Sequence, residues 1–397
     1  MKRLLQISLD VLLTSALPIV MWIVLGIVVR SEVASVFSLT YPIQFVWLIL
    51  VNLFAVGPNI TARKLKDRNV VMTNLIMGIV VGGVLTIFLC VNVDAYIIMM
   101  NLDPVAYHDF VFYGMVWLYI SFIAQIISQK LYYVGKNNSS NIMNLFLNGV
   151  NFLMIVGFNL MMSEWNAITL TLVFDAAIII AFLLKNFEKR KFSLRFLQNI
   201  KNTSFNILDY LGLLLAYGFG FMNSFSYGEI FVVAITFDTL TTDAQWDVLI
   251  HSVGTTAEID ISKGRFVYRK SLKNAYKLLA ILIGSVLVMD ALLYSYYRPE
   301  LWVFLVILAI GVITMILEPL VEYRWKYLQI ENNKIEHNVV VFGVRVIRVL
   351  ISFLPTAFCT YIGQTFEVAS ELIYTSIKCR KFKVFQRGKT LNRLRGR

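Results

Sequence analysis

KNFEKRKFSLRFLQNIK, residues 185–201, carries six basic side chains in a chain that is otherwise strongly apolar. Lys and Arg in short connections between membrane-spanning segments accumulate on the cytoplasmic side of a bilayer. The stretch lies near the middle of the 397 residues. We therefore interpret residues 185–204 as a basic cytoplasmic linker between the two halves of a membrane protein.

The composition of the chain supports a membrane protein. Hydrophobic residues make up 58% and charged residues 15%, whereas a soluble domain has roughly 25% charged residues. A helix needs about 20 apolar residues to cross a bilayer, and such segments recur on both sides of the linker. The predicted spans are residues 5–29, 37–60, 70–93, 110–133, 141–163, 166–184, 205–227, 229–253, 274–296, 300–322, 338–360 and 363–378.

The basic residues also predict an orientation for these spans. They gather at every second junction and in the C-terminal tail, while the other junctions are acidic and aromatic, with only Arg30 and Arg298 nearby. This alternation predicts a multi-pass protein of the cell membrane with both termini in the cytoplasm. The net charge of +12 is then explained by basic residues that set the topology and attract anionic lipid. Nucleic acid is therefore not an expected partner.

The same pattern predicts the domain organisation. We expect an N-lobe of six spans (1–184), the linker (185–204), a C-lobe of six spans (205–378) and a basic cytoplasmic tail (379–397). Residues 32–68 align with residues 229–265 at an offset of 197, pairing Glu32 with Glu229 and Arg68 with Arg265. The predicted fold is all-α: twelve transmembrane helices in two six-helix bundles, related by a pseudo-two-fold axis along the membrane normal. A cleft between two such bundles permits alternating access.

Three stretches resemble the multidrug and toxic compound extrusion (MATE) family of the multidrug/oligosaccharidyl-lipid/polysaccharide exporter superfamily. AVGPNITARKLKDRN (55–69) and SVGTTAEIDISKGR (252–265) resemble the family's cytoplasmic exits from spans 2 and 8. YVGKNNSSNIMNLFLNGVNFLMIVGFNLMM (133–162) resembles its entry into span 5. Many prokaryotic members carry an aspartate well inside span 1, whereas Asp10 lies near the cytoplasmic end, which argues against a cation site in the N-lobe.

Span 8 contains TFDTLTTDAQWDVLIHSVG (236–254), an unusual concentration of charge for a bilayer. Asp243, Asp247 and His251 follow one another at four-residue intervals and share roughly one helical face. Asp238 lies about 140° from Asp243 on an α-helical wheel. We predict that Asp238, Asp243 and Asp247 couple transport to protons or to a Na⁺ at Asp243 and Asp247. The alternative is a span shifted outward, with its acids in water.

Two further acids complete the predicted coupling site. Asp290 lies in span 9, and Glu318 precedes Pro319 in span 10, where the proline removes a backbone hydrogen bond. The alternative for Glu318 is a position near the cytoplasmic headgroups. His251, near the cytoplasmic end of span 8, is assigned to the substrate cleft, with a solvated or capping role as its alternative.

The remaining predicted cleft residues are Asp175, Asn148, Asn151, Arg345 and Arg348. For Asp175 the alternative is a hydrogen bond inside the N-lobe, and for the asparagines it is hydrogen bonding between helices. The two arginines of span 11 could face an anionic headgroup. They could equally pair with Glu318 or Asp290, or snorkel to the surface.

These features favour a Na⁺- or H⁺-driven antiporter that exports amphipathic, cationic small molecules. No GxxxxGK[ST] motif supplies nucleotide energy, and we expect a monomer with no cofactor beyond the coupling ion. The alternative is a flippase for a lipid-linked saccharide or other anionic lipid, which would need a basic cleft. The DxxxD of Asp243 and Asp247 resembles a transferase's magnesium-diphosphate motif, but the second acidic motif such enzymes need is absent, so we do not expect an enzyme.

Overall fold

The computed structural model describes residues 4, 5, 8, 31–134, 136–159, 161–186, 191–262, 264–331, 335–382 and 384–385. The predicted first span with Asp10 and Arg30, and most of the basic tail, lie outside these residues. All the elements of the described part are helices, with no strand among them, as the all-α prediction requires.

The chain divides into two compact units. The N-terminal unit comprises residues 20–222, and the C-terminal unit comprises residues 223–397 with residues 1–19. This division falls near the end of the seventh span, Phe196–Phe225, and not in the basic linker. The predicted lobes, 1–184 and 205–378, were placed by counting six spans in each half, and their boundaries stay a prediction.

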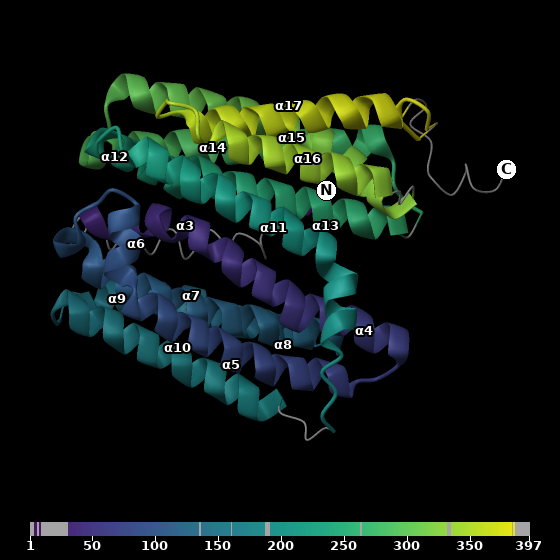
Figure 1. The fold of residues 1–397 in the computed structure, drawn as a ribbon, viewed down its shortest axis with the longest axis horizontal. Coiled ribbons are helices and arrows are strands. Elements are labelled where there is room, and N and C mark those ends of the chain that lie inside the picture. The colour runs from purple at the N-terminus through teal and green to yellow at the C-terminus, as the bar shows by residue number, and fades with distance from the viewer. Residues whose placement is uncertain are drawn as a thin grey trace. The chain divides into compact units, whose positions relative to one another are not determined.

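The N-terminal unit follows the predicted spans. Its elements are α3 (Ser31–Val51), η2 (Asn52–Val56), α4 (Gly57–Leu65), α5 (Asn69–Val91), α6 (Val93–Met99), α7 (Pro104–Tyr133), α8 (Asn137–Asn144), η3 (Leu145–Val150), α9 (Asn151–Asn159), α10 (Glu164–Asn186) and α11 (Phe196–Phe225). The short helix α6 lies in the junction predicted after span 3. Helix α7 packs against both α3 and α5, and α10 packs against α9 (Figure 1).

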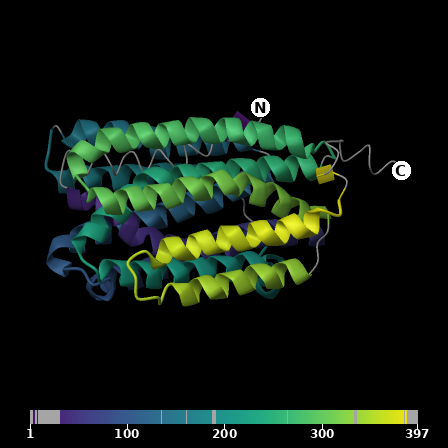
Figure 2. The ribbon, with the colours of Figure 1, turned by 90° about the horizontal axis from the view of Figure 1, so that it is seen from above.

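The C-terminal unit contains the five remaining predicted spans. Its elements are α12 (Glu229–Asp238), η4 (Thr239–Asp243), α13 (Ala244–Ser262), α14 (Tyr268–Tyr297), α15 (Leu301–Glu331), α16 (Ile335–Ile351) and α17 (Cys359–Cys379). Helix α15 continues through Pro319. It packs against α13 and α17, and α17 packs against α16, so α15 and α17 lie side by side (Figures 1 and 2).

The spans differ in how closely they fit an apolar environment. Among the described residues, six helices are long and apolar enough to cross a membrane, or up to seven if the bent pair within 196–225 is one span. The six are Leu39–Ala62, Asn69–Val91, Pro104–Leu131, Asn166–Asn186, Tyr268–Ser295 and Leu301–Leu328. Spans outside this set include α13, α16 and α17, which carry acids or arginines. The polar spans of the C-terminal unit are therefore where a functional site is to be sought.

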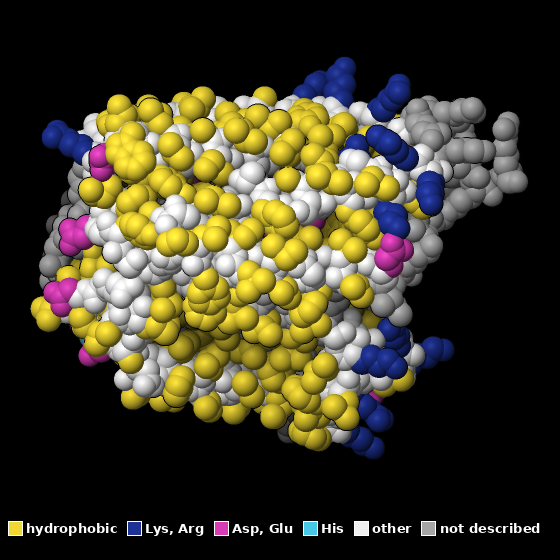
Figure 3. All heavy atoms as spheres, turned by 45° about the horizontal axis from the view of Figure 1, so that its top comes forward, with side chains coloured by type: hydrophobic (Ala, Val, Ile, Leu, Met, Phe, Trp, Pro, Cys, Tyr) yellow, Lys and Arg dark blue, Asp and Glu magenta, His cyan; other side chains and the backbone are white. Residues whose placement is uncertain are grey.

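Polar and apolar side chains separate along the helices of the C-terminal unit. Apolar side chains cover the middle of its visible face, while Lys and Arg gather at one end (Figure 3). The separation matches the predicted cytoplasmic side, although the orientation itself remains a prediction.

Spans 2 and 8 end in the same way. Ser262, the last residue of α13, lies 197 positions after Leu65, the last residue of α4, which is the offset of the sequence repeat. A left-handed residue lies just beyond each helix, Lys66 with φ 54° and Gly264 with φ 65°, but Gly264 is one position past the repeat equivalent of Lys66. Each span also contains a π-helical stretch, η2 or η4, but these stretches lie at different depths in the two repeats.

Candidate functional site

The candidate site in the C-terminal unit is built on the π-helical turn η4. A π-helix bonds residue i to residue i+5 and often occurs at functional sites. In this turn, residues five apart return to nearly the same side of the helix. Asp238 and Asp243, at its two ends, are 3% and 8% exposed, and each lies within electrostatic reach of the other. The predicted separation of about 140° is therefore wrong, because it assumed an unbroken α-helix.

Asp238 is held by the neighbouring helices. The hydroxyl of Tyr361 on α17 donates a hydrogen bond to its Oδ2 at 3.0 Å. Gly311 of α15 allows η4 to approach closely, since a Cβ at this position would lie 2.6 Å from Cγ2 of Thr242 and 3.7 Å from Oδ1 of Asp238. Thr242 lies beside Asp238 but is not aligned to donate to Oδ1, which has no partner among the described residues.

Asp290 of α14 completes a group that we call the aspartate cluster: Asp238, Asp243 and Asp290. Asp290 is 5% exposed and lies within electrostatic reach of Asp238. Thr241 is beside it, yet neither carboxylate oxygen meets the geometry of a hydrogen bond with any described residue. The structure thus brings together three of the predicted coupling residues from spans 8 and 9.

Asp247 and His251 continue along α13 away from this cluster. Asp247 is half-buried and His251 is exposed. Asp247 interacts electrostatically with His251 on one side and with Asp243 on the other. The predicted stripe of Asp243, Asp247 and His251 therefore runs from the interior of the unit to its surface.

A second group of acids lies between α15 and α17. Glu318 is 7% exposed, and its electrostatic neighbours are Glu322, Glu367 and Glu371. The indole of Trp246 is beside Glu318, but Oε2 has no hydrogen-bond partner in the described part of the chain. We call these four acids the glutamate cluster. Of these four acids, only Glu318 is predicted from the sequence, although the four-residue spacing of Glu367 and Glu371 inside span 12 was a usable signal.

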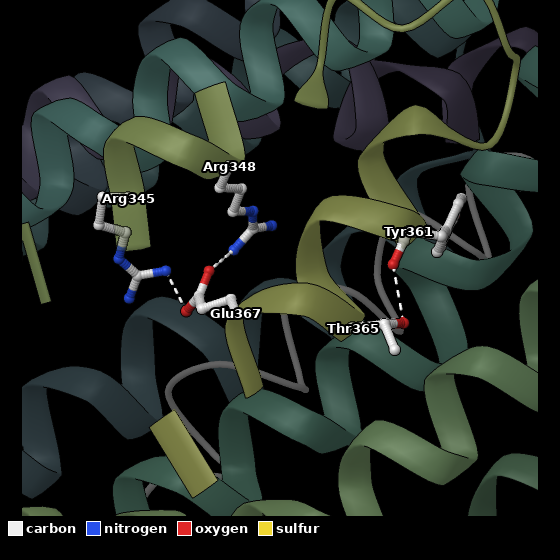
Figure 4. A network of polar contacts seen from close by, with 5 residues as sticks. All are labelled: Arg345, Arg348, Tyr361, Thr365 and Glu367. Carbon is white, nitrogen blue, oxygen red and sulfur yellow. Dashed lines mark hydrogen bonds and ion pairs between the residues drawn. The ribbon is translucent and has the colours of Figure 1, made fainter. Parts of the chain in front are cut away.

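Basic side chains enter the glutamate cluster from two helices. Lys326 approaches Glu322 at 3.7 Å on α15. Arg345 and Arg348 of α16 both form ion pairs with Glu367 of α17 (Figure 4). Glu318 and Asp290 are the partners that the sequence suggests for these arginines, whereas the observed partner is Glu367, which was not predicted.

The predicted residues of the N-terminal unit bond to one another. Asn151 donates to both carboxylate oxygens of Asp175, at 2.6 and 2.7 Å, and these two side chains are 1% and 2% exposed. Asn148 donates to the backbone oxygen of Asn144 at 2.9 Å, within its own span. For Asp175 and Asn151, this is the alternative to a role in the substrate cleft: a hydrogen bond between helices inside the N-terminal unit. In the described ranges no three or more His, Cys, Asp and Glu side chains are grouped so that they could hold a metal ion. The Na⁺ site at the two carboxylates of Asp243 and Asp247 stays a prediction.

The helices and their buried charges define a class: a polytopic, all-α membrane protein with ionisable groups inside its spans. No protein-family model and no curated protein matches the sequence. Solved structures do match. One is an inward-facing multidrug resistance MATE family transporter of the MOP superfamily, with a TM-score of 0.65 and 13% identity over 98% of this chain and 96% of that one.

Two further structures show the same likeness. An outward-facing MATE family transporter of the MOP superfamily has a TM-score of 0.65 and 16% identity, covering 97% of this chain and 96% of that one. A MOP superfamily transporter from Pyrococcus furiosus, described as having a binding pocket of reverse polarity that suggests a different function, has a TM-score of 0.65, 15% identity and 96% coverage of both chains. The resemblance to the MATE family is thus confirmed in the fold: twelve transmembrane helices in two bundles. The matching structures are transporters and not enzymes.

Proposed function

We propose that the chain is an exporter driven by a Na⁺ or H⁺ gradient, which moves amphipathic, cationic small molecules across the cell membrane by alternating access. The matched fold supports the class of transporter, since it includes inward- and outward-facing structures. The ion coupling and the cargo are inferred from the buried acids of the C-terminal unit.

One observation carries this proposal. Oxygens of Asp238, Asp290 and Glu318 are buried without a hydrogen-bond partner among the described residues. A buried carboxylate oxygen that lacks a partner costs about 1–3 kcal/mol or more, so such groups are retained where something else satisfies them. A bound proton or Na⁺ removes this cost, and a cationic cargo can do the same.

An ion can drive the transport cycle only if it binds one conformation more tightly than the other. A tenfold preference corresponds to about 1.4 kcal/mol. A single carboxylate whose surroundings change between the inward- and outward-facing states can supply this difference. We therefore assign the coupling to the aspartate cluster with Asp247.

The test uses proteoliposomes loaded with ethidium as an amphipathic cationic probe. Export should respond to an imposed Na⁺ gradient or an imposed H⁺ gradient, applied separately. Asp243→Asn and Asp247→Asn should each reduce the gradient dependence at least tenfold, while the amounts of folded and inserted protein stay normal. Normal rates and normal gradient dependence in both variants would leave these acids with a structural role only.

A flippase for an anionic lipid precursor is the second candidate, and its test is separate. The transporter with a binding pocket of reverse polarity shows that pocket charge differs among proteins of this fold. In this chain, however, Arg345 and Arg348 already pair with Glu367, which disfavours an anionic headgroup there. Translocation of a fluorescent anionic lipid in the same vesicles, without any response to ethidium, would favour the flippase.

A further inference from the structure

Tyr361 of α17 holds one of the two carboxylate oxygens of Asp238. Its hydroxyl donates to Oδ2 of Asp238 at 3.0 Å, and the two side chains are 4% and 3% exposed. The bond joins α17 to the end of α12, where η4 begins. A hydrogen bond to an ionised acceptor is stronger than one to a neutral acceptor, so the strength of this contact depends on the charge of Asp238.

The other oxygen of Asp238 faces the packing surface between η4 and α15. A Cβ on Gly311 would lie 3.7 Å from Oδ1 of Asp238 and 2.6 Å from Cγ2 of Thr242, so both side chains approach the same point of α15. Oδ1 and the hydroxyl of Thr242 are buried and have no hydrogen-bond partner in the described part of the chain. Oδ1 is therefore the oxygen that remains for a proton or Na⁺.

Helix α17 is fixed on its other side by α16. A Cβ on Gly363 would lie 3.1 Å from Cγ of Arg348, and four residues later Glu367 pairs with Arg348 (Figure 4). Gly363 and Glu367 share one face of the helix, whereas Tyr361 lies roughly 160° from Gly363 around an α-helix. The contacts with α16 thus hold α17 from the side opposite to Tyr361 and fix the direction of its phenol.

We propose that Tyr361 is a positioning residue for ion coupling: it occupies Oδ2 of Asp238, directs the coupling ion to Oδ1, and favours the ionised carboxylate while the site is empty. A hydrogen bond donated to the charged form of an acid favours that form. A proton on Oδ1 leaves Oδ2 as a carbonyl oxygen, to which the phenol donates more weakly.

Ion binding then weakens the contact between α17 and η4. An ion can bias a transport cycle only through such a difference between its bound and unbound states. This role rests on the proposed ion coupling and deepens it, since it assigns the oxygen that takes the ion and the residue that controls its occupancy.

The acids around Asp238 act in the opposite sense to Tyr361. Asp243 at the far end of η4 and Asp290 of α14 lie within electrostatic reach, and negative charges there disfavour an ionised Asp238. From α15 the neighbouring residue is Gly311, which carries no charge. The hydrogen bond from α17 therefore counteracts the two aspartates.

The test follows the protonation of Asp238 by infrared spectroscopy on the purified full chain in lipid vesicles. The carbonyl stretch of the protonated carboxyl group is assigned by its loss in Asp238→Asn and titrated against pH without Na⁺. Tyr361→Phe should raise the frequency of this band, because the carbonyl loses a hydrogen bond. It should also move the pH midpoint of the band up by about one unit, a roughly tenfold higher proton affinity.

Tyr323→Phe is the matched control. It removes a hydroxyl of the same unit, on a side chain 1% exposed, that donates to the backbone oxygen of Ser271 at 3.2 Å. It should leave the frequency and the midpoint unchanged. A ring-fluorinated tyrosine in place of Tyr361 is a stronger donor of nearly the same size, and it should move the midpoint down.

An unchanged frequency and midpoint in Tyr361→Phe, equal shifts in Tyr323→Phe, or the absence of any carbonyl band that depends on Asp238 would overturn this role of Tyr361. Should Tyr361→Phe not fold, an unshifted midpoint with the fluorinated tyrosine overturns it. Export that responds to neither ion gradient, in vesicles where the infrared shifts are present, sinks the proposed coupling and leaves the control of Asp238 by Tyr361 standing.

Discussion

At the residue scale, the buried polar side chains are of two kinds: some have hydrogen-bond partners, and others have none among the described residues. Asp175 receives two hydrogen bonds from Asn151, whereas Asp290 receives none from the described residues. Both are aspartates inside predicted spans. The N-terminal pair is explained by stability, while the unsatisfied aspartate of the C-terminal unit needs a ligand or a proton.

Asn151→Ala should destabilise the protein, because it leaves the buried carboxyl group of Asp175 without its donor. The expected cost is about 1–3 kcal/mol, measured as a lower thermal unfolding midpoint in detergent. Asn148→Ala is the control: its half-buried amide bonds only within its own span, and its loss should cost less. Replacing Asn151 and Asp175 together by leucine removes the unpaired carboxyl group and should cost less than Asn151→Ala alone; a larger cost would contradict this explanation.

Asp67, in the connection between α4 and α5, gives a prediction about pH. The hydroxyl of Ser193 donates to its carboxylate at 2.8 Å, and this hydrogen bond lowers the pKa of Asp67 below its ordinary value of 3.8. Because the pKa is lower in the folded protein, ionised Asp67 stabilises the fold at neutral pH. That contribution is lost as the pH falls through the folded pKa.

Ser193→Ala should therefore lower the unfolding midpoint slightly at pH 7, and this effect should shrink as the pH falls below the ordinary pKa of 3.8. The effect is small because Asp67 is largely open to solvent. Ser226→Ala, which removes a hydroxyl bonded to a nearby backbone oxygen on the surface, should show no such pH dependence. A larger effect of Ser193→Ala at pH 3 than at pH 7 would contradict the assignment.

At the scale of elements, the π-helical turn decides which residues meet. In an α-helix Asp238 and Asp243 would point apart, but η4 turns both into the unit. Close packing against α15 accompanies this turn, and Gly311 permits the approach. The aspartate cluster therefore depends on the π-helical geometry of η4 as well as on the aspartates themselves.

Gly311→Ala should push η4 away from α15, because the new Cβ would lie 2.6 Å from Thr242. Overpacking of this kind costs about 1–3 kcal/mol, visible as a lower unfolding midpoint, and ion binding should weaken as well. Gly284→Ala on α14 is the matched control. Nothing lies within 4 Å of its added Cβ, so alanine there should be neutral or stabilise by about 0.5–1 kcal/mol. An equal response in both variants would refute the close contact.

At the scale of the whole molecule, the fold is shared with transporters at 13–16% sequence identity. Such low identity is compatible with one fold because a membrane-spanning helix mainly requires apolar length, which many sequences provide. The cargo and the coupling ion depend instead on a few polar positions. Those positions carry the functional proposal.

The predicted topology can be tested by labelling single cysteines in a protein whose Cys90, Cys359 and Cys379 are replaced by alanine. Cysteines at Lys191 and Lys381 should react from the cytoplasmic side only, and one at Glu300 from the outside only. Lys191 and Lys381 reacting from opposite sides would mean an odd number of spans between them. The parallel repeat would then be wrong.

Much of this architecture could be predicted from the sequence because the relevant forces act on one segment at a time. Apolar length selects each span, and basic junctions indicate its direction, without reference to any neighbour. The described helices follow the predicted spans closely, with shifts at the ends such as α16, which ends at Ile351 and not at residue 360. Asp243, Asp290 and Glu318 could likewise be found, because a charge inside an apolar segment is conspicuous.

The sequence by itself determined the helical membrane fold, the number of spans, and Asp238, Asp243, Asp290 and Glu318 as charged residues inside spans. Only the tertiary structure decided that Asp238 and Asp243 share a side of their helix, and that Glu367 is the partner of Arg345 and Arg348. A π-helical turn replaces i→i+4 bonds by i→i+5 bonds where packing against α15 favours it. An ion pair between two helices depends on which faces meet. Both are settled by contacts between segments, which the composition of a single segment does not contain.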